Sequence, residues 1–175
     1  MSANRDVLRT RETRSSFVEF EERAATLYLT LARRFRDDTE LSWFWLGMCM
    51  AERQHALVLD FCECQRLLND EPPVDSGVTR SLSELFCDLE NRAARPDLSV
   101  EDAFKIAAEL EGSEINAIYN RLVGPAQGTE YFTRKKIETL GVNHHQLLIE
   151  TARKFGVRAS AIEKMMQLEP EKTQP

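Results

Sequence analysis

The sequence has no long apolar run, and we expect neither a membrane anchor nor an export signal in it. None of its apolar runs approaches the length of about 20 residues that a membrane-spanning helix needs. Its opening residues, MSANRDVLRTRE, are charged and contain no apolar core of the kind found in signal peptides. We therefore expect a cytoplasmic protein with no membrane partner.

Cysteine is scarce, and its four occurrences have neither the spacing of a metal site nor that of a disulfide framework. Cys62 and Cys64 are two residues apart and would point in different directions on a helix, while Cys49 and Cys87 stand alone. No CxxC pair exists, so a rubredoxin-type iron site and a cysteine-based zinc site are excluded. We expect the thiols to be reduced.

An excess of positive charge is also absent. The chain has 23 Lys and Arg against 29 Asp and Glu, a formal net charge of −6, which disfavours non-specific binding to nucleic acid. A length of 175 residues, 42% hydrophobic and 30% charged, fits one domain with a sizeable core. We expect a flexible segment at 1–15, the folded domain at 16–168 and a disordered tail at 169–175.

What the sequence does contain is a series of amphipathic segments with helical periodicity. Capping residues mark three of their starts: the Ser16-x-x-Glu19 box, Asp37-Asp-Thr39 and the Ser99-x-x-Asp102 box. The predicted long helices cover 16–36, 39–68, 100–123 and 129–155. Shorter helices are predicted at 78–89 and 160–168. The resulting fold class is all-α, a four-helix bundle with a long crossover between the second and third helices and a short extra C-terminal helix.

Two polar residues interrupt the apolar stripe of the second helix. The stripe contains Phe44, Met48, Ala51, Leu59 and Cys62, and Glu52 and His55, three residues apart, fall within it. Burying a carboxylate and an imidazole among apolar groups costs several kcal/mol unless each finds a partner. Either other buried polar groups or a metal ion must therefore meet them.

The other long helices supply such groups. Glu21 lies at the edge of the first helix's apolar stripe beside Tyr28, whereas Glu19 and Glu22 point away from it. In the third helix, Glu111 and Glu114 fall within the apolar stripe, while Glu101 and Glu109 do not. In the fourth helix, His144 is central to the apolar stripe and His145 lies toward its edge. The candidate metal ligands are Glu21, Glu52, His55, Glu111, Glu114 and His144.

The second helix carries another apolar stripe on roughly its opposite side. It contains Trp43, Leu46, Met50, Leu57 and Phe61. A helix that is apolar on two sides must be covered on two sides. We expect a homodimer with this stripe partly in the interface; the alternative is that the segment 78–89 covers it within one chain.

These residues resemble the rubrerythrin-like branch of the ferritin-like di-iron carboxylate proteins, over roughly residues 16–155. The motifs that carry the resemblance are Glu21 with Tyr28, Glu52-x-x-His55, Glu111-x-x-Glu114 with Tyr119, and His144. The resemblance implies a ferritin-like bundle that holds two iron ions, with manganese or zinc as substitutes. It implies an oxidoreductase that reduces peroxide or dioxygen with electrons from an unidentified donor. It also implies that Glu52 and Glu111 bridge the ions and that Tyr28 serves catalysis as a hydrogen-bond donor.

The chain departs from the family at its fourth helix, where the family has Glu-x-x-His. Gly141 stands three residues before His144, and Val142 stands three before His145. The rubredoxin domain of full-length rubrerythrins is also missing from these residues. We expect the ion nearer His144 to bind more weakly. Two other functions remain open: an iron-binding or storage-related protein without turnover, and a bundle with one structural metal that works by binding a partner.

Overall fold

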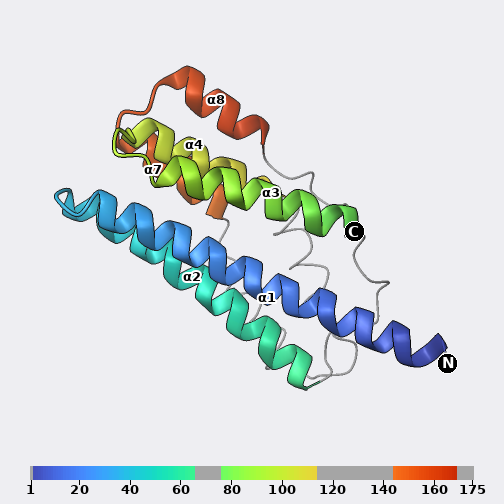
Figure 1. Cartoon of the computed structure of the whole chain (residues 1–175). Coiled ribbons are helices and arrows are strands. Elements are labelled where there is room, and N and C mark those ends of the chain that lie inside the picture. The colour runs from blue at the N-terminus through green and yellow to red at the C-terminus, as the bar shows by residue number, and fades with distance from the viewer. Residues whose placement is uncertain (1, 66–75, 114–143, 169–175) are drawn as a thin grey trace.

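The computed structural model describes residues 2–65, 76–113 and 144–168, with the side chains of the first helix described from Phe17 on. These residues form six α-helices and no strand, which confirms the all-α class. The helices are α1 (Ser2–Arg34), α2 (Thr39–Cys64), α3 (Ser76–Ala93), α4 (Val100–Glu111), α7 (His144–Lys154) and α8 (Ala159–Gln167) (Figure 1). None of them is long and apolar enough to cross a membrane. The predictions for Glu114, Tyr119 and Gly141 lie outside the described residues.

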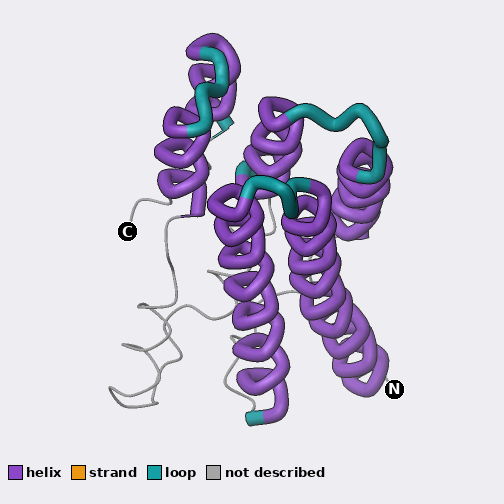
Figure 2. Tube along the Cα trace, turned by 90° about the vertical axis from the view of Figure 1, so that its left-hand side faces the viewer, coloured by secondary structure: helices purple, strands orange, loops and turns teal. Residues whose placement is uncertain are grey.

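The first two helices form an antiparallel hairpin, in which α1 and α2 lie side by side and are joined by a short turn (Figures 1 and 2). Asp38 caps α2 as predicted, because its Oδ1 accepts a hydrogen bond from the Leu41 amide at 3.0 Å. The apolar stripe of α1 is buried against the other helices. Its buried members are Phe17, Phe20, Ala24, Leu27 and Leu31.

The start of α1 differs from the prediction. The helix begins at Ser2, so Ser16 and Glu19 lie inside it and do not form an N-terminal capping box. The physical reason is that residues 2–34 contain neither proline nor glycine, so nothing in the chain interrupts the helix once it has formed. Most of the residues expected as a flexible leading segment are therefore the first turns of α1.

The crossover helix α3 is longer than predicted and belongs to the core. It packs against α1 and α4, and Phe86 stacks on Phe20 with ring centroids 5.4 Å apart. The Arg23 guanidinium donates two hydrogen bonds to the Glu90 carboxylate, at 2.8 and 2.9 Å, and its plane lies over the Phe86 ring. These contacts fix α3 on α1.

The outer stripe of α2 stays uncovered in this arrangement. Trp43, Met50, Leu57 and Phe61 are 66%, 64%, 68% and 54% exposed, while Leu46 packs partly against the core. The alternative in which the crossover segment covers this stripe is therefore wrong. The reason is that the apolar face of α3, with Phe86 at its centre, packs against α1 and α4 instead of against α2.

The helix α4 begins as predicted but ends early. Ser99 caps it by accepting a hydrogen bond from the Asp102 amide at 3.1 Å. The helix ends at Glu111 rather than at Val123, because Gly112 and Ser113 are poor helix formers. A Cβ on Gly112 would lie 2.5 Å from the carbonyl oxygen of Leu168, so this position also requires glycine for the close approach of α8.

Gly156 ends α7 as predicted. Its φ is 70°, and the amides of Gly156 and Val157 donate to the carbonyls of Arg153 and Ala152 at 3.2 and 3.0 Å, the pattern of a Schellman cap. This turn folds α8 back onto α4 and α7. The start of the predicted fourth helix, at 129–143, lies outside the described residues.

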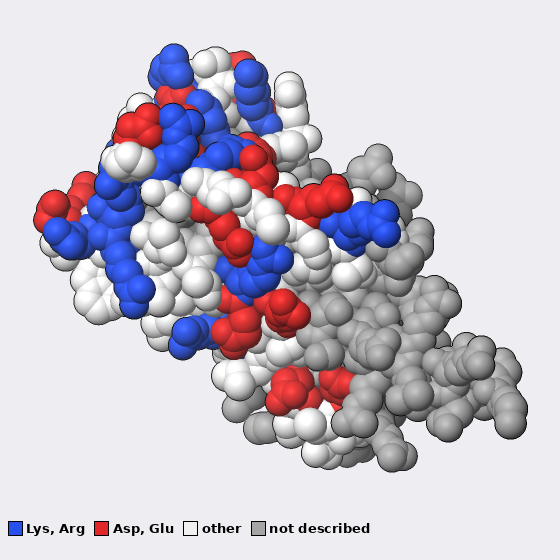
Figure 3. Space-filling model, in the orientation of Figure 1, with Lys and Arg blue, Asp and Glu red and all other residues white. Residues whose placement is uncertain are grey.

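Ion pairs connect the helix ends around this region. Arg158 donates to Glu101 at 2.6 and 2.5 Å, and Lys154 pairs with Glu40. Figure 3 shows acidic and basic side chains side by side over the upper part of the visible face. Exposed pairs of this kind contribute at most about 1 kcal/mol each, so packing decides how the helices lie.

Candidate metal centre

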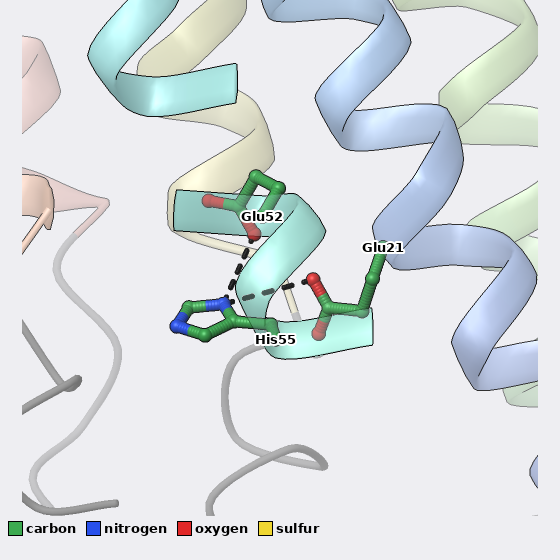
Figure 4. A group of neighbouring side chains, drawn as sticks. All are labelled: Glu21, Glu52 and His55. Carbon is green, nitrogen blue, oxygen red and sulfur yellow. Dashed lines mark hydrogen bonds and ion pairs between the residues drawn. The ribbon is translucent and has the colours of Figure 1, made fainter. Parts of the chain in front are cut away.

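Three ligand-type side chains from α1 and α2 meet inside the hairpin. Glu21 of α1 faces Glu52 and His55 of α2 (Figure 4), and the three are 1%, 3% and 5% exposed. The His55 Nδ1 atom lies 3.1 Å from Glu52 Oε2 and 3.8 Å from Glu21 Oε2. The three-residue spacing of Glu52 and His55 places both side chains on the same face of α2, one turn apart.

A second group shares Glu52 with the first. The His144 Nδ1 atom of α7 lies 3.0 Å from Glu52 Oε1 and 3.6 Å from Oε2 of Glu111, which α4 contributes. The His144 and His55 rings stack with centroids 5.3 Å apart. Glu52 therefore presents one carboxylate oxygen to each group, which is the arrangement a carboxylate needs to bridge two ions.

The spacing within each group fits a metal ion. Two ligand atoms that each lie about 2.1 Å from one ion are roughly 3.0–3.4 Å apart at octahedral or tetrahedral angles. Two of the four distances in the two groups, 3.0 and 3.1 Å, lie in this range, and the other two, 3.6 and 3.8 Å, exceed it by a few tenths of an ångström. Within each group, one ligand atom of every residue lies within 4.8 Å of the others.

Several buried polar atoms at this centre lack a hydrogen-bond partner. They are both carboxylate oxygens of Glu21, Oε1 of Glu52 and Nε2 of His144. Glu52 Oε1 is close to His144 Nδ1 but without the angles of a hydrogen bond. Each buried polar atom without a partner lowers the stability of the fold by about 1–3 kcal/mol, and a charged atom lowers it by more. A bound cation would satisfy the carboxylate oxygens, so the donor set fits a metal.

The four groups influence one another's pKa. Burial raises the pKa of Glu21 to about 8. Burial also acts to raise the pKa of Glu52, but the two imidazoles outweigh it and lower that pKa to about 2. The carboxylates in turn outweigh the burial of His55 and His144 and raise their pKa values to about 9 and about 10. At neutral pH the metal-free centre thus holds protons on Glu21 and on both histidines, which an ion would displace.

Tyr28 holds one of the candidate ligands. Its hydroxyl, fully buried, donates to Glu111 Oε1 at 2.5 Å, and its ring stacks on Trp45 with centroids 6.0 Å apart. Burial and the nearby carboxylates raise its pKa well above the ordinary value of 10, so the phenol keeps its proton. Glu111 is consequently oriented with its other oxygen toward His144.

The structure brings five of the six predicted ligands together, and Glu114 lies outside the described residues. Glu19 and Glu22 are exposed, as the helical phase predicted. Glu111 belongs to the second group only, although the resemblance implies that it bridges. Among the described residues, Glu52 alone is shared.

Sequence reasoning placed His145 at the edge of its helix, yet it is 5% exposed. Both its ring nitrogens lack a hydrogen-bond partner. A stripe formed with the buried residues Ile149 and Ala152, four and seven positions further on, was the signal that could have identified it as buried. His145 belongs to neither group of candidate ligands.

Comparison with known proteins finds no matching family, no similar curated protein and no matching solved structure.

Proposed function

We propose that the chain is a ferritin-like, rubrerythrin-like four-helix bundle protein that binds two iron ions and reduces peroxide or dioxygen. The observation that carries this proposal is the buried Glu21 carboxylate, 1% exposed and without a hydrogen bond, opposite a Glu-x-x-His pair. A residue that served packing alone would not place a carboxylate there. The cytoplasmic location and the separate electron donor are parts of the same proposal.

Each ion would have its own set of protein ligands. Glu21, Glu52 and His55 would hold one, and Glu52, Glu111 and His144 the other. Carboxylate and imidazole ligands suit iron, and they also suit manganese and zinc. The burial of all five side chains keeps water away from the centre and strengthens the charge interactions within it.

The chemistry and the protein's part in it are separable. When bound, two ferrous ions supply the two electrons that peroxide needs for reduction to water, with two protons taken up. The Tyr28 hydroxyl donates a hydrogen bond to Glu111 and so orients this carboxylate. The phenol keeps its own proton on the oxygen beside the carboxylate. Trp45, packed on Tyr28 and fully buried, fixes the direction of the phenol.

The test is elemental analysis of the purified protein, followed by peroxide consumption with added ferrous iron. Two iron ions per chain and peroxide turnover would support the proposal. Two ions without turnover would favour an iron-binding or storage-related protein, and one ion a structural site. Glu22→Ala is the matched control for substitutions at Glu21, since Glu22 is exposed on the same turn of α1.

A further inference from the structure

The uncovered face of α2 has the periodicity of a coiled-coil seam. Its members follow one another at intervals of four and three residues, and all are exposed: Trp43, Gly47, Met50, Gln54, Leu57 and Phe61. The four large apolar side chains among them are between 54% and 68% exposed. Intervals of four and three are the pattern by which one helix packs along another.

The area of this seam reaches the threshold for a specific contact with a second helix of the same kind. With exposures of 54% to 68%, its four large side chains present on the order of 500 Å² of apolar surface. That is within the range of the largest patches on monomeric proteins, which are often functional. Two such faces together bury about 1,000 Å², the lower bound of a specific protein–protein interface.

We propose that the occupant is a second copy of this chain, with α2 antiparallel to the partner's α2 across a two-fold axis. Full overlap of the two seams pairs each seam residue with another. Trp43 then lies opposite the partner's Phe61, Gly47 opposite the partner's Leu57, and Met50 opposite the partner's Gln54. This interface is independent of the proposed metal chemistry, because the seam lies on the side of α2 away from Glu52.

Two features select this register. A shift by one heptad leaves Leu57 and Phe61 without a seam partner in one direction, and Trp43 and Gly47 in the other. A Cβ added to Gly47 would meet nothing within 4 Å, so the surface is open where the partner's Leu57 arrives. A parallel two-fold would instead set Gly47 against the partner's Gly47 and leave an unfilled gap.

The oligomeric state tests the interface. Sedimentation should show a dimer, and Leu57→Glu should raise the dimer dissociation constant on the order of a hundredfold, since two leucines leave the interface. Met166→Glu, on α8 and 49% exposed, is the matched control and should leave the dimer unchanged. A monomer at about 100 μM, or a dimer indifferent to Leu57→Glu, would overturn the proposal.

Cross-linking tests the register. In a background with the exposed Cys64 and Cys87 changed to serine, Gly47→Cys and Leu57→Cys are made in separate chains. A disulfide should form when the two variants are mixed and not when either is alone. A disulfide in Gly47→Cys alone would overturn the antiparallel arrangement. A dimer that forms no disulfide in any combination would overturn this register.

Discussion

The two groups at the candidate metal centre share Glu52 but are assembled differently. Glu21, Glu52 and His55 come from one hairpin, α1 and α2, whose helices follow each other directly in the chain. The second group needs α4 and α7 as well, so it forms only when distant parts of the chain have packed. The first group is thus the more local structure, and the second depends on the whole fold.

The groups also differ in how their outer carboxylates are held. Tyr28 donates to Glu111, whereas neither oxygen of Glu21 has a hydrogen-bond partner. The outer carboxylate of the second group is therefore already held in place before an ion binds. The outer carboxylate of the first group has no hydrogen bond, so a bound ion would give it its first polar partner.

The largest effect is expected from removing the shared residue. Glu52→Ala should abolish binding at both groups, because each loses a carboxylate oxygen. His55→Ala should remove only the first ion and His144→Ala only the second. Metal counts per chain by elemental analysis check all three, with the exposed Glu22→Ala as control. Loss of both ions in His55→Ala would show that the groups do not bind separately.

A large effect is also expected from pH. In the metal-free protein Glu21, His55 and His144 have pKa values raised to about 8, 9 and 10, so the folded state holds more protons than the unfolded state. Their contribution to stability is present at low pH. It declines from about pH 4.5 for Glu21 and from about pH 6.5 for the histidines, and is lost above about pH 10.

We therefore expect the metal-free protein to be less stable at about pH 9 than at about pH 6, by on the order of a few kcal/mol. Added zinc should restore more stability at the higher pH, since the ion displaces these protons. Urea denaturation with and without zinc measures both quantities. A metal-free protein whose stability rises over this interval would show that these groups are not buried together.

An intermediate effect is expected from Tyr28→Phe, which removes the donor to Glu111 and keeps the ring on Trp45. Affinity at the second group should fall about 10–100-fold, while the first group should be unaffected. Competition with a chelator of known affinity distinguishes the two sites. An equal fall at both groups would mean that Tyr28 acts on the centre as a whole.

The smallest effect is expected from Gly112→Ala. The new Cβ would collide with the Leu168 carbonyl and displace α8 from the end of α4, at a cost of about 1–3 kcal/mol. Because Glu111 directly precedes Gly112, binding at the second group should weaken slightly and the first should not. Lys164→Ala, at an exposed position of α8, is the control, and thermal unfolding is the measurement.

Helical phase predicted much of this arrangement from sequence. It separated the buried Glu21 from its exposed neighbours Glu19 and Glu22, and it placed Glu52 and His55 inside. The same reasoning misjudged the centre of the stripe on α2, where Trp45 is fully buried and Phe44 only partly. Both faces of that helix are apolar, so composition alone did not fix which of two adjacent aromatic residues points inward.

The remaining errors concern ends and neighbours of helices. The Ser16-x-x-Glu19 pattern can occur at the start of a helix or in its interior. The sequence alone did not distinguish the two cases, and the structure shows that α1 is continuous through Ser16. The early end of α4 follows from Gly112 and Ser113, but the need for glycine at 112 comes from its close approach to Leu168, a residue far away in the chain. The partners of α3 were likewise set by packing of Phe86 on Phe20, which no local pattern reveals.

The two tryptophans of the chain stand two residues apart on α2, with opposite surroundings. Trp45 is fully buried against Tyr28, whereas Trp43 is 66% exposed on the seam. Indole fluorescence responds to its surroundings, so the chain carries one optical probe inside and one outside. Emission from a Trp43→Phe variant would follow ions arriving near Tyr28. Emission from a Trp45→Phe variant would follow the arrival of a second chain, and one helix would report the two events separately.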